Sequence, residues 1–497
     1  MPSPASRRLL RRGLIAGAVV LIVAGGLVAF VLLHAPGNVS NPGVQFTQPT
    51  SATTTTSSTT RAARRRAANT FAWPWYGYDA GRTRNFNSAA NLRPPVHHGW
   101  TFDAKALLEF PPVIWHGTMF MLGDDGIAHA IRTTNGRQIW SRQVGTLAAA
   151  SPAVDGRDHL IVLPVLSRHG TSPGGGAFLA LSMRTGRTVW VHPLPAGSES
   201  SPIISGSTVY FGDQSGTLYS MRLRDGHVYW TYHAAGAIKG GPALVGGVLY
   251  FGDYAGRVYA IRAVNGRAVW TVGTDGAHFG FGSGQFYATP AVAYGRVYIG
   301  NTDGRVYSFG TAHGTLAWAT GTGAYVYAAA AVADPPKLGP TVYVGSYDGY
   351  LYAFDARSGR VRWRHYAGGR ISGAAVVIDG VVYFSVLRIR RTVGLDAATG
   401  RVVFSFGDGD FSAAIADQHA LYVDGYGSVN QFLPGRAPAR RRAHRRRAHR
   451  THRHAAHRGH RRAGRRLHRR AVRTGRQRAR RSTTKRHSRR KTVARTR

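Results

Sequence analysis

The side chains best suited to bind a ligand occupy one recurring position in this chain. Each stands three residues before a Pro or Ala that begins a short apolar stretch, except for one arginine that lies a residue earlier. They are Glu109, Glu199, Lys239, Tyr287, Tyr327, Arg370 and Asp410. Acids, cations and aromatic rings that converge on a concave surface are typical of a ligand site. The alternative is that these positions are polar because loop residues usually are.

Catalytic signatures are scarce in this sequence. Because the chain has no Cys, it can form no disulfide, thiolate metal site or Cys nucleophile. It contains no H-E-x-x-H motif and no P-loop. Glu109 and Glu199 could act as metal ligands, but two carboxylates on separate repeats form a weak pattern. We therefore predict no catalytic residue, no metal site and no enzymatic activity.

A repeated unit must position these side chains. Seven copies of one phrase recur along the chain, among them AIRTTNGRQIW ending at Trp140 and AFDARSGRVRW ending at Trp363. The closing aromatics are 40 to 50 residues apart, and a unit contains four short segments rich in Val and Tyr, separated by Gly-containing turns. A period of this length, with four strands in each unit, is the signature of an all-β propeller.

The repeated aromatic residues are expected to be structural. A large indole on the outer strand can dock between blades, against small residues of the next copy, and tie the blades together. The predicted docking residues are Trp100, Trp140, Trp190, Trp230, Trp270, Trp318, Trp363 and Phe404.

The number of units predicts eight blades. Their first strands begin near Pro112, Pro152, Pro202, Pro242, Pro290, Ala330, Ala374 and Ala413. The eighth unit lacks a closing strand, whereas a spare one, residues 96–102, contains Trp100. We predict that this N-terminal strand completes the last four-stranded antiparallel blade, because closing the ring removes exposed sheet edges.

The phrase A-x-D/N-x-x-T-G-x-x-x-W, preceded by VYxGxxDGxLYA, resembles the docking motif of quinoprotein (PQQ-type) eight-bladed propellers over residues 71–434. That family includes PQQ-dependent alcohol dehydrogenases, a lipoprotein of outer-membrane assembly and other non-enzymatic extracytoplasmic propellers. The resemblance implies a ligand funnel at the loops before the first strands, where the seven side chains named above would meet. The dehydrogenases also need a calcium-like ion, a catalytic Asp and usually a vicinal disulfide. Without a Cys pair, the chain fits the non-enzymatic branch and no cofactor is expected; PQQ with calcium is the alternative.

The N-terminal region predicts a membrane anchor. Residues 13–33 are uncharged and mostly apolar, and as a helix they would be long enough to cross a bilayer. Arginines in residues 1–12 favour a cytoplasmic N-terminus, which makes this a single-pass signal anchor with an extracytoplasmic propeller. The alternative is a cleaved signal peptide. Residues 34–70, rich in Pro, Ser and Thr, are predicted to be a flexible linker.

Charge is concentrated in the C-terminal tail. The chain has 65 Lys and Arg against 22 Asp and Glu, and 28 of the basic residues but none of the acids lie in residues 436–497. Such a segment cannot bury a core, so residues 435–497 are predicted to be disordered. Its expected partners are anionic wall polymers or lipid head groups, with nucleic acid as a further possibility.

Two insertions interrupt the regular spacing, at residues 164–178 and 273–287. Insertions in propellers map to loops that often bind partners. We expect His278, Phe279 and Phe281 to contact a partner. The sequence thus predicts a monomeric, membrane-anchored scaffold that binds an envelope protein or peptide; the alternative is an enzyme or sensor that holds a small molecule in the funnel.

Overall fold

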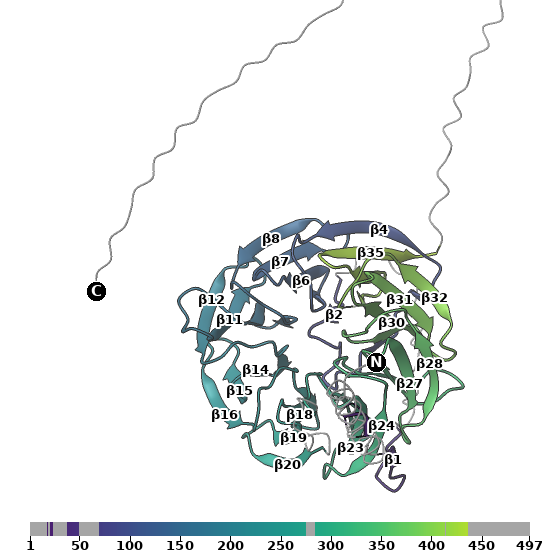
Figure 1. Cartoon of the computed structure of the whole chain (residues 1–497). Helices are drawn as coiled ribbons and strands as arrows, with labels where there is room; N and C mark the ends of the chain where they lie inside the picture. Colours follow the sequence, from purple (N-terminus) through teal and green to yellow (C-terminus); the bar gives the residue numbers. More distant parts are fainter. Residues whose placement is uncertain are drawn as a thin grey trace, which may run out of the picture. The chain divides into compact units, whose positions relative to one another are not determined.

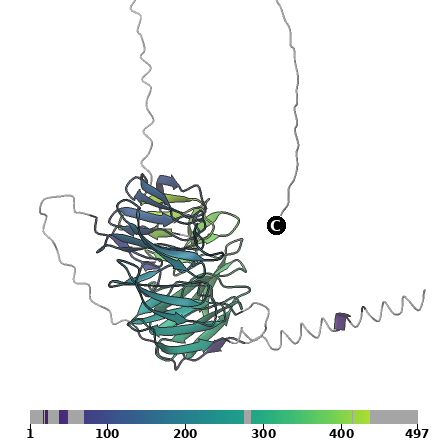
Figure 2. The same ribbon diagram turned by 90° about the vertical axis from the view of Figure 1, so that its left-hand side faces the viewer.

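The computed structural model describes residues 17, 20–22, 37–48, 69–274, 284–412 and 414–435. Within them, eight sheets, each with four blade strands that pair antiparallel, surround a central channel (Figure 1). Each sheet has its first strand beside the channel and its last strand at the rim, and Figure 2 shows the same blades from the side. The predicted eight-bladed β-propeller is confirmed.

The strands of the first four blades follow one another from the channel outward. Blade 1 contains β5 (Val113–Trp115), β6 (Thr118–Leu122), β7 (Ile127–Arg132) and β8 (Gln138–Gln143). Blade 2 contains β9 (Ala153–Asp155), β10 (Leu160–Val165), β11 (Gly176–Ser182) and β12 (Thr188–Leu194). Blade 3 contains β13 (Ile203–Ser205), β14 (Thr208–Gly212), β15 (Thr217–Arg222) and β16 (Val228–His233). Blade 4 contains β17 (Ala243–Val245), β18 (Val248–Gly252), β19 (Arg257–Arg262) and β20 (Ala268–Gly273).

The other four blades have the same order. Blade 5 contains β21 (Ala291–Ala293), β22 (Arg296–Gly300), β23 (Arg305–Gly310) and β24 (Leu316–Gly321). Blade 6 contains β25 (Ala331–Ala333), β26 (Thr341–Gly345), β27 (Tyr350–Asp355) and β28 (Val361–Tyr366). Blade 7 contains β29 (Val376–Ile378), β30 (Val381–Val386), β31 (Arg391–Asp396) and β32 (Val402–Phe406). Blade 8 contains β33 (Ala414–Ala416), β34 (Leu421–Asp424), β35 (Ser428–Pro434) and β4 (Val96–Asp103).

The burial of each strand explains its composition. Strand β22, RVYIG, is buried at every position because neighbouring blades cover both of its faces. Strand β16, VYWTYH, lies at the rim and alternates between half-buried and exposed residues, because one of its faces meets solvent. The middle strands therefore read as continuous apolar runs and the outer strands as alternating ones.

The seven tryptophans tie each blade to the next. Every indole Nε1 donates a hydrogen bond of 2.8–3.2 Å to a backbone carbonyl of the following blade. Every ring also lies against a glycine of that blade, so close that an added Cβ would stand 2.6–2.9 Å from it. Gly359, which has a φ of +74° and faces Trp318, is an example. The glycine of the repeated phrase is thus required for two reasons: its backbone has a positive φ, and the indole leaves no room for a Cβ.

Phe404 stands in the eighth docking position and cannot donate a hydrogen bond. It is 9% exposed and packs edge-on against Phe432 of blade 8, with ring centroids 5.3 Å apart. This junction between blades 7 and 8 is therefore held by apolar contacts alone at the position where the other blades use an indole.

The ring is closed by the N-terminal strand, as predicted. Strand β4 pairs antiparallel with β35 and places Thr101 opposite Asn430. The Trp100 indole then donates to Thr133 of blade 1 at 3.0 Å. Blade 8 is in this way built from both ends of the propeller sequence, and the sheet that closes the ring has no missing outer strand.

Part of the segment predicted as a flexible linker lies against the propeller. Strand β1 (Val39–Ser40) adds to the outer edge of β24, and Phe46 stacks on Tyr294 at 5.2 Å. The buried guanidinium of Arg296 donates from Nε to the Gln45 carbonyl at 2.5 Å. Residues 37–48 are therefore attached to blade 5.

Where the structure describes the chain, no helix is long and apolar enough to span a membrane. Most of residues 13–33, the predicted anchor, and all of the tail after residue 435 lie outside the described residues.

Candidate functional site in the central channel

Residues 71–92, which we call the strap, cross the central channel. The backbone carbonyls of the strap accept hydrogen bonds from six blades: the acceptors are Phe71, Pro74, Ala80, Gly81, Thr83 and Arg84. Strap strand β2 (Ala72–Trp73) pairs with β5, and strand β3 (Asn85–Phe86) runs parallel to β29 (Figure 1). The strap is thus fixed to the innermost strands and forms a floor across the channel.

The strap contains two buried arginines. Arg82 and Arg84 are 0% and 2% exposed, and both have left-handed backbone conformations, with φ of 58° and 53°. Such conformations are uncommon for residues with side chains and are retained where surrounding contacts hold them. Here the strap hydrogen bonds do so.

Arg82 is a structural clamp. Its Nε donates to the Pro242 carbonyl at 3.1 Å, its Nη2 donates to Ser201 and Pro202 at 3.0 and 3.1 Å, and its Nη1 donates to the Tyr76 carbonyl. Burial, and next the neighbouring Arg84, lower the pKa of Arg82 to about 9. All three nitrogens of its guanidinium are therefore satisfied by backbone, and the strap is joined to blades 3 and 4.

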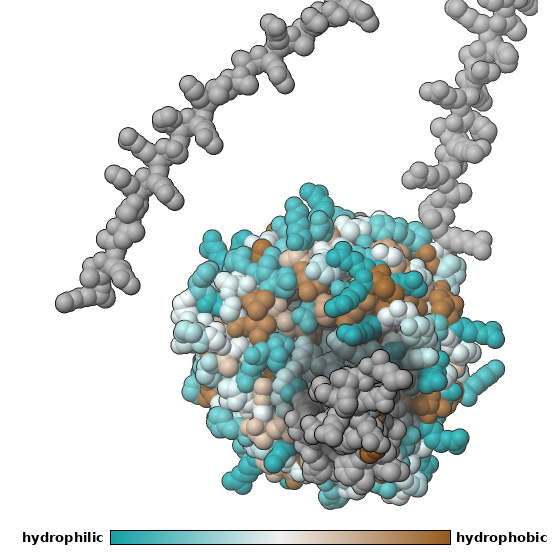
Figure 3. All heavy atoms as spheres, in the orientation of Figure 1, coloured by the Kyte–Doolittle hydropathy of each residue, from teal (hydrophilic) through white to brown (hydrophobic). Residues whose placement is uncertain are grey.

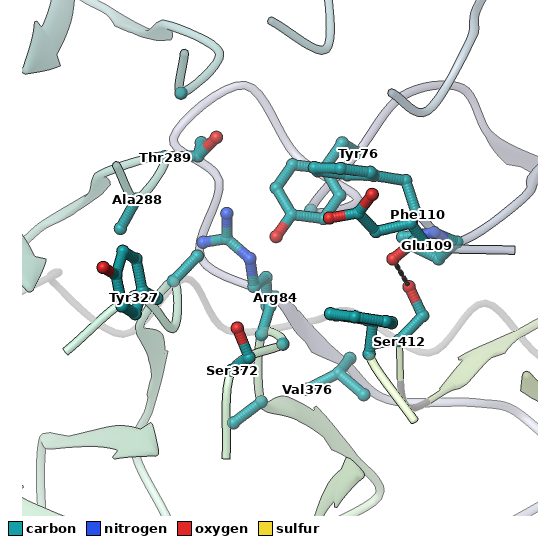
Figure 4. A pocket seen from close by; sticks show the side chains of 18 of the residues that line it. Tyr76, Arg84, Glu109, Phe110, Ala288, Thr289, Tyr327, Ser372, Val376 and Ser412 are labelled. Atoms are coloured by element: carbon teal, nitrogen blue, oxygen red, sulfur yellow. Dashed lines mark hydrogen bonds between the residues drawn. The ribbon is translucent and has the colours of Figure 1, made fainter. Parts of the chain in front are cut away.

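Above the strap lies a cavity of about 750 Å³, its open mouth included. The strap contributes Trp73, Tyr76 and Arg84 to its lining, and the loops before the innermost strands contribute most of the wall (Figure 4). This volume includes open solvent: the space that the centre of a water-sized sphere can occupy is about 60 Å³, enough for a few water molecules or one side chain of a partner. Figure 3 shows hydrophilic side chains around the rim of the ring, interrupted by hydrophobic patches.

The structure brings four of the predicted residues into the lining of this cavity: Glu109, Lys239, Tyr287 and Tyr327. A fifth, Glu199, is 8% exposed and is joined to this group by hydrogen bonds rather than by lining the cavity itself. The loops before the innermost strands thus place these side chains as the repeat register predicts.

Glu199 is the centre of a hydrogen-bonded cluster. Its Oε1 accepts from Lys239 Nζ at 2.8 Å and from Gln214 Nε2 at 2.7 Å, and its Oε2 accepts from the Tyr287 hydroxyl at 3.0 Å. The Lys239 ammonium also lies over the ring of Tyr254, 5.2 Å from the centroid. Burial, and next the charge of Glu199, raise the pKa of Tyr287 well above its usual value, so it stays a donor at neutral pH.

Glu109 stands apart from this cluster. Its side chain has no hydrogen-bond donor among the residues that the structure describes, although its backbone carbonyl accepts from Ser412 Oγ at 2.8 Å (Figure 4). Burial, and next the charge of Glu199, raise the pKa of the Glu109 carboxyl to about 7, against the opposing effect of Lys239. Near neutral pH this group can therefore either hold or release a proton inside the cavity.

Two predicted residues are placed elsewhere. Arg370 is exposed and lies over the ring of Tyr347, 5.6 Å from its centroid. Asp410 accepts a hydrogen bond from the Arg388 backbone N–H at 2.9 Å. Neither lines the cavity. The predicted partner contacts His278, Phe279 and Phe281 lie outside the described residues.

Sequence reasoning missed the strap. Trp73, Tyr76 and Arg84 precede the first repeat and have no period that could place them in the channel. The only available signal was composition: residues 71–86 contain three Tyr or Trp side chains in succession around a Pro, at positions 73, 75 and 76, and then two arginines two residues apart.

A closed ring of eight blades docked through tryptophans, with a cavity at its centre, defines a propeller of the PQQ-like repeat class. The chain belongs to the family described as outer membrane protein assembly factor BamB, which it matches over residues 97–238, 230–337 and 328–494. No curated protein sequence matches the chain.

Several solved structures share the fold. BamB from Moraxella catarrhalis is 19% identical, with a TM-score of 0.56, and the match covers 68% of this chain and all of that one. The quinohemoprotein alcohol dehydrogenase from Comamonas testosteroni is 14% identical with a TM-score of 0.59, covering 76% of this chain and 82% of that chain. A europium-containing methanol dehydrogenase is 12% identical with a TM-score of 0.60, covering 73% and 98%. At these identities the likeness shows the fold alone.

Proposed function

We propose that this propeller is a non-enzymatic binding and scaffold module of the cell envelope, whose central cavity receives part of a partner protein or peptide. The observation that carries this proposal is the cavity itself, which is closed below by the strap and lined by aromatic and ionisable side chains. Membership in a family described as an outer-membrane assembly factor supports a role in protein binding.

The regions outside the propeller complete the proposal. The apolar residues 13–33 anchor the chain in a membrane, with the propeller on the extracytoplasmic side. The basic residues 436–497 hold anionic wall polymers or lipid head groups through counterion release. Nucleic acid would bind the same tail with an equally steep salt dependence, so the tail alone does not distinguish these partners.

A quinone held by calcium does not fit the residues of this cavity. Among the described residues no group of three or more His, Asp or Glu side chains is placed to hold a metal ion. The Glu199 carboxylate already has the Lys239 ammonium at 2.8 Å, where a divalent cation would have to replace it. The remaining carboxylate, Glu109, carries a raised pKa and would have to lose its proton to bind a metal.

Site-directed photocrosslinking in cells tests the binding role. A photoreactive phenylalanine analogue replaces Tyr327 in the cavity or, as the control, Tyr229, which is 47% exposed on the outer strand β16. We expect adducts with one envelope protein from position 327 and none from position 229. Equal adducts from both positions, or none from position 327, would refute the proposed role of the cavity.

Thermal unfolding of the full chain with PQQ and calcium tests the alternative. A ligand that binds only the folded state raises the Tm. We expect no shift, whereas a rise in Tm that disappears in Glu109→Ala would replace the scaffold proposal with a cofactor site.

A further inference from the structure

Of the two strap arginines, Arg84 is the one with a hydrogen-bond acceptor for only one of its three guanidinium nitrogens. Its Nη1 donates to the carbonyls of Arg82 and Ala330, at 2.6 and 2.8 Å. Its Nε and Nη2 are buried and have no hydrogen-bond acceptor among the described residues. Arg82, two residues away, has acceptors for all three nitrogens, so the deficit at Arg84 is specific to its position.

The charge of Arg84 is also uncompensated in the described part of the chain. No carboxylate there forms an ion pair with it. The nearest aromatic partner is the Tyr76 ring, 4.6 Å from Arg84 Cζ, which stabilises a cation only modestly. A buried guanidinium with two free donors is unfavourable until an acceptor binds.

The two unpaired nitrogens of Arg84 indicate which acceptor would fit. Nε and Nη2 share one edge of the planar guanidinium, and the two oxygens of a carboxylate match that edge in a bidentate pair. Figure 4 shows the Arg84 side chain directed into the cavity. We propose that the cavity binds a ligand through a single carboxylate placed on the Nε–Nη2 edge of Arg84.

The side chains that line the cavity indicate the chemistry of the rest of the ligand. Trp73, Tyr76, Phe110, Tyr327 and Phe411 supply aromatic surface, so the body of the ligand is apolar or aromatic. Lys239, the other cation in the lining, is paired with Glu199 at 2.8 Å, so Arg84 alone offers an unpaired positive charge there, which favours one carboxylate over a phosphate dianion or a polycarboxylate. Two sources present this chemistry: a free monocarboxylic acid with an aromatic body, and the C-terminal carboxylate of a peptide. This inference rests on the proposed function, because it identifies the group that the cavity recognises.

Calorimetric titration of the full-length protein in detergent, at a fixed salt concentration, tests the assignment. The probes are 3-phenylpropionate, a tripeptide ending in phenylalanine with a free carboxylate, and the same tripeptide as its C-terminal amide. The variants are Arg84→Met, Arg84→Lys and, as the matched control, Arg370→Met, which removes an arginine outside the cavity lining. The basic tail attracts every anion equally in all variants, so the Arg84 site is judged from the difference in affinity between the variants and the native protein.

We expect at least one carboxylate probe to bind the native protein, and Arg84→Met to weaken that binding about tenfold or more. Arg84→Lys keeps the charge but loses the paired donors, so it should weaken binding as well, while Arg370→Met should leave it unchanged. Binding of the free tripeptide but not of its amide identifies a peptide terminus; binding of 3-phenylpropionate alone identifies a small acid.

Binding that is equal in the native protein, Arg84→Met and Arg370→Met would overturn the assignment, as would the absence of binding by both carboxylates. If Arg84→Met does not fold, the comparison of Arg84→Lys with the native protein decides the same question. Crosslinks from position 327 that persist while the carboxylates fail would leave the scaffold proposal standing and remove only the Arg84 site.

Discussion

The contact between the Trp318 indole and Gly359 gives a quantitative test of how the blades are joined. An alanine at position 359 would place its Cβ 2.6 Å from Trp318 Cδ2, inside the contact distance that real Cβ atoms keep. It would also hold a side chain at a φ of +74°. Gly206 is a matched control, because its φ is +61° but no atom lies within 4 Å of the position that a Cβ would take.

Both substitutions place an alanine in a left-handed backbone conformation, but only Gly359→Ala also brings its Cβ into steric conflict with the Trp318 indole. A left-handed conformation costs an alanine about 1–2 kcal/mol, and overpacking a filled core costs about 1–3 kcal/mol more. Gly206→Ala should therefore lower the free energy of unfolding by about 1–2 kcal/mol and Gly359→Ala by about 2–5 kcal/mol.

Urea unfolding followed by circular dichroism measures both values, with an unchanged slope showing that the same surface is exposed. In a Trp318→Leu background Gly359→Ala should cost less than it does in the native protein, because the smaller side chain leaves room for the methyl group. Equal losses for Gly206→Ala and Gly359→Ala, or no coupling with Trp318→Leu, would refute the role that we assign to the indole contact.

Three further predictions concern the cavity and the tail. Because the folded-state pKa of Glu109 is raised from 4.5 to about 7, the folded protein holds a proton that the unfolded chain loses, so stability should fall as the pH rises through this window; urea midpoints should show this slope, and Glu109→Gln should flatten it. Lys239→Met leaves the Glu199 carboxylate without its cation and should lower the unfolding free energy by about 1–3 kcal/mol in the same assay, most of it recovered by adding Glu199→Gln. Deletion of residues 436–497 should abolish salt-dependent binding to polyphosphate in fluorescence anisotropy; a truncated protein that still binds it would place the anion site on the propeller.

The repeat made the blades predictable from the sequence. Each unit repeats its strand pattern, its turn glycines and its closing Trp, so local propensity and periodicity agree at every blade. The same register brings Glu109, Lys239, Tyr287 and Tyr327 to the cavity, because equivalent positions of the repeats lie in equivalent loops around the ring.

The parts that escaped prediction have no period. The strap residues Trp73, Tyr76 and Arg84 reach the channel through hydrogen bonds to blades that lie up to about 300 residues later in the chain, and no local pattern encodes such contacts. Arg370 and Asp410 occupy the predicted region, but their loops direct them to Tyr347 and to the Arg388 backbone instead.

Closing blade 8 with an N-terminal strand has a consequence for the order of folding. Strand β4 is made early, yet its partner β35 is among the last segments of the propeller to be synthesised. Pairs so distant in sequence form slowly, because a long loop must close before any contact rewards it. Until then the edges of β35 and β4 are unpaired, and such edges favour association between chains. The nascent propeller is therefore most vulnerable to aggregation just before its ends meet, and any factor that shields these two strands would promote its folding.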